Sequence, residues 1–213
     1  MVDSNSPLSD IPGVVLAGGR SQRMGIDKAL VRLGGLSLLD RAIDRFSPQI
    51  SSVALNADSN GSQTHYLPLV PDTIPGKAGP LAGVLAAMRY TAENHGNATH
   101  VATVPVDTPF FPLNLISRLI TGIGPGNTIA IAASNGRRHP VFGLWPVAIA
   151  DDLQDWLNRN ETRRVLDFLR RHDVQDVDFP MTVTRVGLLD PFFNINTPDD
   201  LAQAERWLEV LGS

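Results

Sequence analysis

The segment at residues 16–29, LAGGRSQRMGIDKA, combines the residue types that bind a nucleoside triphosphate. Gly18 and Gly19 let backbone N–H groups approach phosphate oxygens without an intervening Cβ. Arg23 and Lys28 can offset the negative charge that develops on a leaving pyrophosphate. The spacing fits neither G-x-x-x-x-G-K-[ST] nor G-x-G-x-x-G, so this is a different phosphate loop. The competing interpretation is a simple turn with two solvent-exposed cations; the apolar run before the segment and the predicted helix after it favour the loop.

Asn56, Asp72 and Asp107 each follow a short apolar run of the kind that forms a buried strand. The Thr-Pro pair after Asp107 ends its strand and holds the carboxylate at the strand end. Mg²⁺ takes one or two carboxylates and completes its shell with water and substrate phosphates, so Asp107 is a candidate metal ligand. Asn56 and Asp72 suit hydrogen bonding to a base or ribose. Each of the three could instead be a turn or loop residue bonded to nearby backbone.

Apolar periodicity predicts strands that alternate with helices along the chain. Buried strands are predicted at residues 14–16, 53–55, 69–70, 100–106, 129–132 and 141–144, with a basic turn at 134–139. Helices are predicted at about 38–46, 80–88, 113–120, 147–157, 162–171 and 198–211. Right-handed crossovers place helices over both faces of a parallel sheet, which predicts an α/β fold: a three-layer α/β/α sandwich with a mostly parallel, Rossmann-like sheet. Ligands of such sheets bind beyond the carboxyl ends of the strands, where the glycine loop and the three polar residues fall.

Length and composition indicate one ordinary globular domain. With 213 residues, 43% hydrophobic and 19% charged, the chain can bury a full core. We expect a flexible tail at residues 1–10 and a single domain at 11–213. The net charge of −4 argues against nucleic acid or a membrane surface as a partner, and no apolar run approaches the roughly 20 residues of a spanning helix. The absence of Cys and of a signal-peptide pattern fits a cytoplasmic protein.

The glycine loop resembles the signature L-A-G-G-x-S-x-R-M-G-x-D-K-A of the molybdenum cofactor guanylyltransferases, a family of nucleotidyltransferases. Four further segments are similar to that family's motifs and occur in the family's order: GPLAG at 79–83, PVDTPF at 105–110, HPVF at 139–142 and FNINTP at 193–198. The resemblance covers nearly the whole chain, from Val14 to Leu201. Val106 stands where the family often has Cys, a neighbour that is not expected to do chemistry.

The resemblance implies a nucleotide-diphospho-sugar transferase type of fold and Mg²⁺-dependent transfer of GMP from GTP to the molybdopterin cofactor, with release of pyrophosphate. A phosphate monoester is already ionised near neutral pH, so no general base is needed. The family's catalytic roles would fall on Lys28, Arg23 and Asp107, with Asp107 holding the metal. The nucleotide-binding residues would be Leu16, Ala17, Gly18, Gly19, Lys28, Asn56, Asp72 and Asp107.

Pterin binding is the second role that the resemblance implies. Its candidates are basic or amide side chains: Arg137, His139, Arg163, Arg164, Asn194 and Asn196. Asn194 and Asn196 alternate on a predicted short strand, one face of which would meet the site. The basic residues could equally be surface charges that face solvent. Transient contact with cofactor-delivery proteins or molybdoenzymes is a further expectation.

The Gly-Gly pair of Leu-Ala-Gly-Gly resembles the guanylyltransferases, whereas related cytidylyltransferases tend to carry Leu-Ala-Ala-Gly, so GTP is expected over CTP. Three other functions stay open: a cytidylyltransferase acting on the same pterin, a sugar-phosphate nucleotidyltransferase of this fold, and a noncatalytic nucleotide-binding subunit. Turnover with each nucleotide, with and without the pterin, distinguishes the first two. Only the third would tolerate the loss of Asp107 or Lys28.

Overall fold

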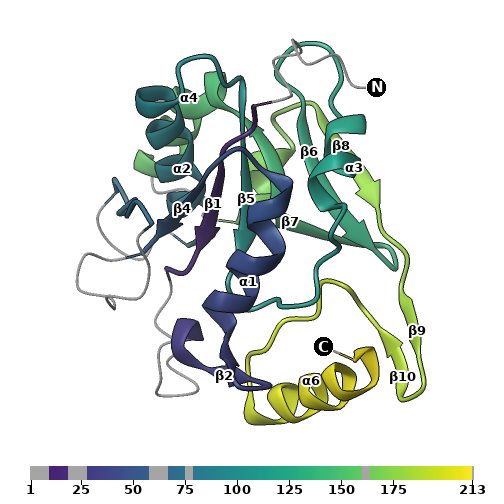
Figure 1. Ribbon diagram of the computed structural model, residues 1–213. Helices are drawn as coiled ribbons and strands as arrows, with labels where there is room; N and C mark the ends of the chain where they lie inside the picture. The colour runs from purple at the N-terminus through teal and green to yellow at the C-terminus, as the bar shows by residue number, and fades with distance from the viewer. Residues whose placement is uncertain (1–9, 19–27, 58–66, 75–78, 160–163, 213) are drawn as a thin grey trace.

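The computed structural model describes residues 10–18, 28–57, 67–74, 79–159 and 164–212. Their centre is a six-stranded sheet covered by helices on both faces, with strand order β4-β1-β5-β7-β6-β8 (Figure 1). The strand bounds are β1 Gly13–Leu16, β4 Val53–Asn56, β5 His100–Pro105, β6 Ile129–Ser134, β7 Arg137–Pro146 and β8 Val174–Asp178. The tail expected at residues 1–10 lies outside the described residues except for Asp10. Within the described ranges, no helix has both the length and the apolar character needed to cross a membrane.

Strand β1 lies between two parallel neighbours. Its residues pair in register with β4 on one side and with residues 102–105 of β5 on the other. The carboxyl ends of β4, β1 and β5 therefore meet at one edge of the sheet, as predicted. β7 runs antiparallel to both β5 and β6, and β8 is parallel to β6, so β7 is the one strand of this sheet that runs the other way. The mostly parallel sheet is confirmed.

The antiparallel strand follows from a tight hairpin between β6 and β7. Asn135 and Gly136 form its turn with φ of 47° and 72°. An Asn-Gly pair adopts this left-handed backbone at little cost and matches the twist of a two-residue hairpin. The basic turn predicted at 134–139 is thus too long, because Arg137 and the two residues after it belong to β7.

Alternate side chains of the strands face two separate cores. In β1, Val15 packs into a core with α1, α3 and α6, whereas Val14 and Leu16 pack into a core with α2, α4 and α5. This is the predicted three-layer sandwich (Figure 1). The helix bounds are α1 Leu38–Phe46, α2 Pro80–Asn94, α3 Leu115–Thr121, α4 Ala150–Asn158, α5 Val165–Leu169 and α6 Pro198–Leu211.

Helices α1 and α6 begin with reciprocal capping boxes. The Ser37 hydroxyl accepts the Asp40 N–H at 3.0 Å, and the Asp40 carboxylate accepts the Ser37 N–H at 3.2 Å. Thr197 and Asp200 make the same pair of bonds at the start of α6, at 3.1 and 2.9 Å. Each box satisfies two N–H groups that a helix start leaves unpaired. The start of α6 is therefore fixed, and the segment before it approaches the sheet edge at a defined angle.

Several predicted elements differ in the structure. Leu69 makes only an isolated parallel bridge with Leu55, so Asp72 does not follow a strand. Residues 194–196 are irregular and not a strand, since the Ile195 N–H donates to the Asp107 carbonyl at 2.8 Å outside any ladder. The helix expected at 162–171 is the shorter α5, and residues 162–163 lie outside the described ranges. The helix expected from residue 147 starts with a 3-10 turn at Val147–Ile149 before α4.

Five strands were not predicted: β8, the hairpin of β9 (Thr182–Thr184) and β10 (Gly187–Leu189), and two shorter strands before α1. Most of their side chains are half-buried or exposed, so they lack the continuous apolar run that marks the central strands. The two shorter strands, β2 (Arg32–Leu33) and β3 (Leu36–Ser37), form another small hairpin. The β9–β10 hairpin extends beyond the main sheet next to α6 (Figure 1).

Candidate active site

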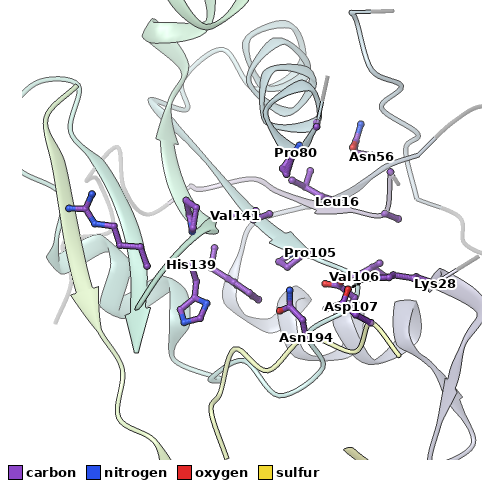
Figure 2. A pocket seen from close by; sticks show the side chains of 18 of the residues that line it. Leu16, Lys28, Asn56, Pro80, Pro105, Val106, Asp107, His139, Val141 and Asn194 are labelled. Atoms are coloured by element: carbon purple, nitrogen blue, oxygen red, sulfur yellow. Dashed lines mark hydrogen bonds and ion pairs between the residues drawn. The ribbon is translucent and has the colours of Figure 1, made fainter. Parts of the chain in front are cut away.

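A cavity of about 680 Å³ lies beyond the carboxyl ends of β1, β4 and β5. Figure 2 shows three groups of side chains around it: Leu16, Asn56 and Pro80 at one end, Lys28 beside Asp107 at a second, and His139 at a third. Residues 16–18, 105–107 and 137–142 supply most of its walls. The cavity therefore lies at the edge of the sheet where the sequence predicted ligand binding.

The end of the cavity next to β4 is built around Asn56, which is only 3% exposed. Its amide nitrogen donates to the Val70 carbonyl at 2.8 Å and to the Asp72 carboxylate at 2.9 Å. Both amide hydrogens are thus used, and the Oδ1 atom points toward Gly18 and Gly83. A Cβ on those glycines would lie 3.3 and 2.5 Å from Oδ1. Glycine at both positions lets an acceptor oxygen reach the cavity between the glycine loop and α2.

Lys28 and Asp107 meet at the second end, 79 residues apart in sequence. The Lys28 Nζ atom lies 2.7 Å from Asp107 Oδ2 and 2.5 Å from Asn196 Oδ1. Both charged side chains are mostly buried, with 17% and 16% exposed. The Thr108 hydroxyl lies 3.3 Å from Asp107 Oδ1, but it donates its single hydrogen to Asn194 Oδ1 at 2.7 Å. An ammonium group has three hydrogens, so two bonds leave one for a further acceptor in the cavity.

Asp200 connects this ion pair to the start of α6. Its Oδ2 atom accepts the backbone N–H groups of Asn196 and Thr197, both at 2.9 Å. Burial raises the pKa of this carboxyl, but the bonds from Asn196 and Thr197 together with the Lys28 charge outweigh it, so the net pKa lies below its usual range. Asp200 therefore stays ionised and fixes the backbone that carries the Lys28 partner Asn196. The sequence prediction missed this role, although the Thr-x-x-Asp cap was visible in it.

The donor set of the cavity fits Mg²⁺. Among the described residues, no group of three or more His, Cys, Asp or Glu side chains is placed to enclose a metal by itself. Mg²⁺ requires less, because it binds through one or two carboxylates and keeps waters and substrate phosphates as its other ligands. The Asp107 carboxylate at the cavity wall is of the type that Mg²⁺ would need there.

The wall formed by β7 contains Arg137, Arg138 and His139. Arg138 pairs with Asp176 at 2.9 Å, whereas the exposed Arg137 makes no hydrogen bond or ion pair within the described part of the chain. The His139 ring stacks on Phe192 with its centroid 4.6 Å away. The Asn56 end and the β7 wall of the cavity thus differ in character: acceptors lie near Asn56, whereas cations and an imidazole lie along β7.

Most predicted site residues come together in this cavity. The predicted residues that line it are Leu16, Ala17, Gly18, Lys28, Asn56, Asp72, Asp107, Arg137, His139, Asn194 and Asn196. Arg164 does not; it lies at the N-terminus of α5. Gly19, Arg23 and Arg163 lie outside the described residues. Thr108 was not predicted, yet its hydroxyl donates to Asn194 Oδ1 at 2.7 Å and holds that side chain at the cavity.

A family model described as a MobA-like NTP transferase domain matches residues 13–175. This chain belongs to that family. A relative from Rhizobium rhizogenes named "Molybdenum cofactor guanylyltransferase" is 60% identical over 204 residues, which cover 95% of this chain and 94% of the relative. A relative of the same name from a Bradyrhizobium species is 41% identical over 207 residues, 95% of each chain.

Solved structures show the same fold. The crystal structure of molybdopterin-guanine dinucleotide biosynthesis protein A from Archaeoglobus fulgidus has a TM-score of 0.71 at 23% identity and covers 93% of this chain and 99% of its own. The 2-C-methyl-D-erythritol 4-phosphate cytidylyltransferase from Thermus thermophilus has a TM-score of 0.63 at 18% identity, covering 94% and 100%. The fold is thus shared with a guanine dinucleotide biosynthesis protein and with a cytidylyltransferase, and it does not by itself select a substrate.

The match to the MobA-like domain ends at residue 175, before the segment that completes the cavity. Asn194, Asn196 and Asp200 all come from the last 40 or so residues, yet Asn196 bonds the Lys28 ammonium directly. The relatives align over this segment too, since they cover about 95% of the chain. The C-terminal segment is therefore part of the site and not an appendage to the MobA-like domain.

Proposed function

We propose that this chain is a molybdenum cofactor guanylyltransferase, which transfers GMP from GTP to the molybdopterin cofactor and releases pyrophosphate. The observation that carries the proposal is the Lys28–Asp107 pair, 2.7 Å apart in the cavity beside the end of the glycine loop, in a chain 60% identical to a relative of that name. A cation for phosphate and a carboxylate for a metal at one sheet edge are the parts that nucleotidyl transfer needs.

The nucleotide occupies the Asn56 end of the cavity in this proposal. Leu16, Ala17 and Gly18 provide a backbone wall, and Asn56 and Asp72 provide acceptor oxygens. Guanine presents two neighbouring donors, N1–H and N2–H₂, to such acceptors, whereas cytosine presents one amino group beside acceptors. Asn56 Oδ1 makes no hydrogen bond within the described ranges, and it suits a donor of the base. This polarity supports GTP over CTP.

The phosphates extend from there toward Lys28. The terminal phosphate oxygen of the pterin attacks the α-phosphorus of GTP, a new P–O bond forms, and the bond to the bridging oxygen of pyrophosphate breaks. Lys28, together with Arg23 and the Gly19 backbone, neutralises charge on the leaving group. Asp107 would hold Mg²⁺, and a bound Mg²⁺ would supply further charge neutralisation at the phosphates. Positioning and charge account for the acceleration, and no side chain has to remove a proton from an ionised phosphate.

The pterin lies along β7 in this proposal. Arg137 and His139 line that wall, and Asn194 and Asn196 stand between it and Lys28. Arg163 and Arg164 are proposed as further phosphate contacts, although Arg164 does not line the cavity of the described structure. Cofactor-delivery proteins or molybdoenzymes would meet the open side of the cavity transiently, in the cytoplasm.

One experiment tests the function directly: pyrophosphate release from GTP and from CTP, each with and without a molybdopterin-bearing protein. We expect release with Mg²⁺, GTP and the pterin together and little with any of them omitted. Preferential use of CTP would make the chain a cytidylyltransferase instead. Release that requires a hexose 1-phosphate and no pterin would assign it to the sugar-phosphate nucleotidyltransferases, and nucleotide binding without any release would make it a noncatalytic subunit.

A further inference from the structure

His139 is the end of a partly buried chain of hydrogen bonds. Its Nε2 atom lies 2.8 Å from the Ser134 hydroxyl, and that hydroxyl donates to Asp190 Oδ1, also at 2.8 Å. Ser134 is fully buried at the end of β6. Asp190 is fixed in turn, because the same Oδ1 atom accepts the Phe192 N–H at 2.9 Å. The three side chains come from β6, β7 and the segment before α6.

The direction of the bonds decides where the imidazole proton lies. A serine hydroxyl has one hydrogen, and an ionised carboxylate can only accept, so the Ser134 hydrogen is used on Asp190. Ser134 Oγ must then accept from His139, which places a proton on Nε2. Burial lowers the pKa of His139; the Asp190 charge raises it, the Arg137 charge lowers it, and the net pKa lies below the usual value. The neutral ring therefore has a bare Nδ1.

The surroundings of the ring leave Nδ1 for a ligand. One face of the imidazole stacks on Phe192, and the residue lines the cavity between Arg137 and Phe142. No described residue bonds Nδ1. Arg138 is paired with Asp176 at 2.9 Å and Asp190 accepts from Ser134, so Arg137 is the cation on this wall that makes no ion pair within the described residues. A donor on a bound molecule is the partner that Nδ1 lacks.

We propose that His139 is a specificity-determining residue that accepts, through Nδ1, a hydrogen bond from an N–H or O–H group of the second substrate. Ser134 and Asp190 are positioning residues that hold the ring in the tautomer able to accept. The inference rests on the proposed function for the identity of that substrate, a pterin, whose ring carries N–H donors. It adds His139 as a recognition element outside the nucleotide end of the cavity. Ser134 and Asp190, which hold its ring, do not line the cavity themselves.

The tautomer can be measured without any substrate. In ¹⁵N-labelled full-length protein at pH 7.5, long-range ¹H–¹⁵N correlation of the His139 ring should show a protonated Nε2 and an unprotonated Nδ1. Ser134→Ala should give a mixture of tautomers, because the acceptor for Nε2–H is gone. A protonated Nδ1 in the unaltered protein would overturn the proposal. This measurement does not depend on the chain being a guanylyltransferase.

Kinetics then test the recognition role. His139→Gln keeps an amide that can donate to Ser134, but its acceptor oxygen belongs to the same terminal amide and does not occupy the position of Nδ1. The KM for the molybdopterin-bearing protein should therefore rise about threefold to tenfold, the worth of one neutral hydrogen bond. Ser134→Ala should raise the same KM. The KM for GTP should not change in either variant. Thr128→Val is the matched control, because its buried hydroxyl also donates to an aspartate, Asp173 at 2.9 Å, at the opposite end of β6.

The outcomes separate the two proposals. If the unaltered protein does not transfer GMP from GTP to the pterin, the proposed function and the assignment of the pterin as second substrate are both wrong. The tautomer measurement still tests the hydrogen-bond chain in that case. If turnover occurs but His139→Gln has the KM of the unaltered protein, or raises the KM of both substrates equally, His139 is structural and the recognition role is overturned.

Discussion

Lys28 is the residue on which the two halves of the site converge. Its ammonium bonds Asp107 from the end of β5 and Asn196 from the segment before α6. An incoming triphosphate must use the remaining hydrogen or displace one of these acceptors. The same contacts hold the amine at the cavity before substrate arrives, so little side-chain entropy is lost on binding.

Removing either charge of this pair should reduce catalysis far more than stability. Lys28→Met is expected to lower kcat/KM about 100-fold to 1,000-fold, as for loss of one charge-stabilising donor. Asp107→Asn should abolish Mg²⁺-dependent pyrophosphate release. Asp151→Asn is the control, since it breaks an exposed ion pair with Arg89 away from the cavity and should leave kcat/KM unchanged. Retention of full activity by Asp107→Asn would contradict the metal assignment.

Gly83 should matter through the space it leaves for Asn56. Alanine in a helix normally gains about 0.5–1 kcal/mol over glycine. Here its Cβ would lie 2.5 Å from Asn56 Oδ1 and 3.2 Å from the Leu16 side chain, so Asn56 must move. Gly83→Ala is expected to raise the KM for GTP at least several-fold. Gly96→Ala, where a Cβ meets nothing within 4 Å, should not change it. Equal KM values for both variants would show that the Asn56 position is irrelevant to nucleotide binding.

The position of a single site residue could be predicted where that residue lies at the end of a central strand. Asp107 and Asn56 follow apolar runs, and the parallel sheet brings such ends together whatever their separation in sequence. The contact of Lys28 with Asn196 joins residues 168 positions apart through an irregular segment, and no periodicity in the sequence indicates it. The Ser134–His139–Asp190 chain escaped prediction for the same reason, because the Asp190 turn and the β6–β7 hairpin meet only in the folded protein.

At the scale of elements, the two capping boxes offer a matched pair of variants. Asp40→Asn in α1 and Asp200→Asn in α6 each weaken a helix start, and each should reduce the free energy of unfolding by about 0.5–1 kcal/mol. Only Asp200 also holds the Asn196 backbone beside Lys28. We therefore expect Asp200→Asn alone to lower kcat, measured as pyrophosphate release at saturating substrates. If Asp40→Asn lowered kcat equally, the effect would come from general loss of stability.

Element boundaries followed from local signals where these were strong. The helix at residues 38–46 was predicted correctly, because its apolar side chains recur at helical spacing and a Ser-Pro pair follows its end. The sequence of β8 has no such signal, as three of its five side chains are exposed at the sheet edge. Leu69-Val70 looked like a strand because it is apolar, yet it contributes only one bridge to Leu55. Whether an apolar segment becomes a strand depends on the pairing partners it finds, and sequence periodicity does not reveal these partners.

At the scale of the whole molecule, the layered fold was predictable and the composition of the site only in part. Alternating apolar strands and helices require a covered parallel sheet, and its strand order then places the crevice. The C-terminal segment returns across that crevice from beyond β8 and brings Asn194, Asn196 and Asp200 with it. Because the segment is irregular, its path depends on caps and turns and not on a repeating pattern.

The buried His100 and the half-buried His139 should make the stability of the whole fold depend on pH. His100 is 5% exposed; its Nδ1 lies 2.9 Å from the Thr99 hydroxyl and its Nε2 faces the Thr128 carbonyl, whose residue bonds Asp173. Burial lowers the pKa of His100, with a smaller opposing effect from the Thr128 carbonyl, and burial likewise lowers the pKa of His139. The folded state therefore favours both neutral rings.

The sign of the pH effect follows from that preference. Below about pH 6.5 these histidines bind protons in the unfolded state while they are still neutral in the folded state. The unfolded state is therefore favoured as pH falls. Stability from these two rings is complete above that pH and is lost as pH falls through their folded pKa values, with a slope of at most about 1.4 kcal/mol per pH unit for each ring. Urea unfolding at pH 7.5, 6.5, 5.5 and 5.0 should show the decline. His100→Gln should reduce its slope, and a free energy of unfolding that stays level across this range in the unaltered protein would show that neither ring is held neutral by the fold.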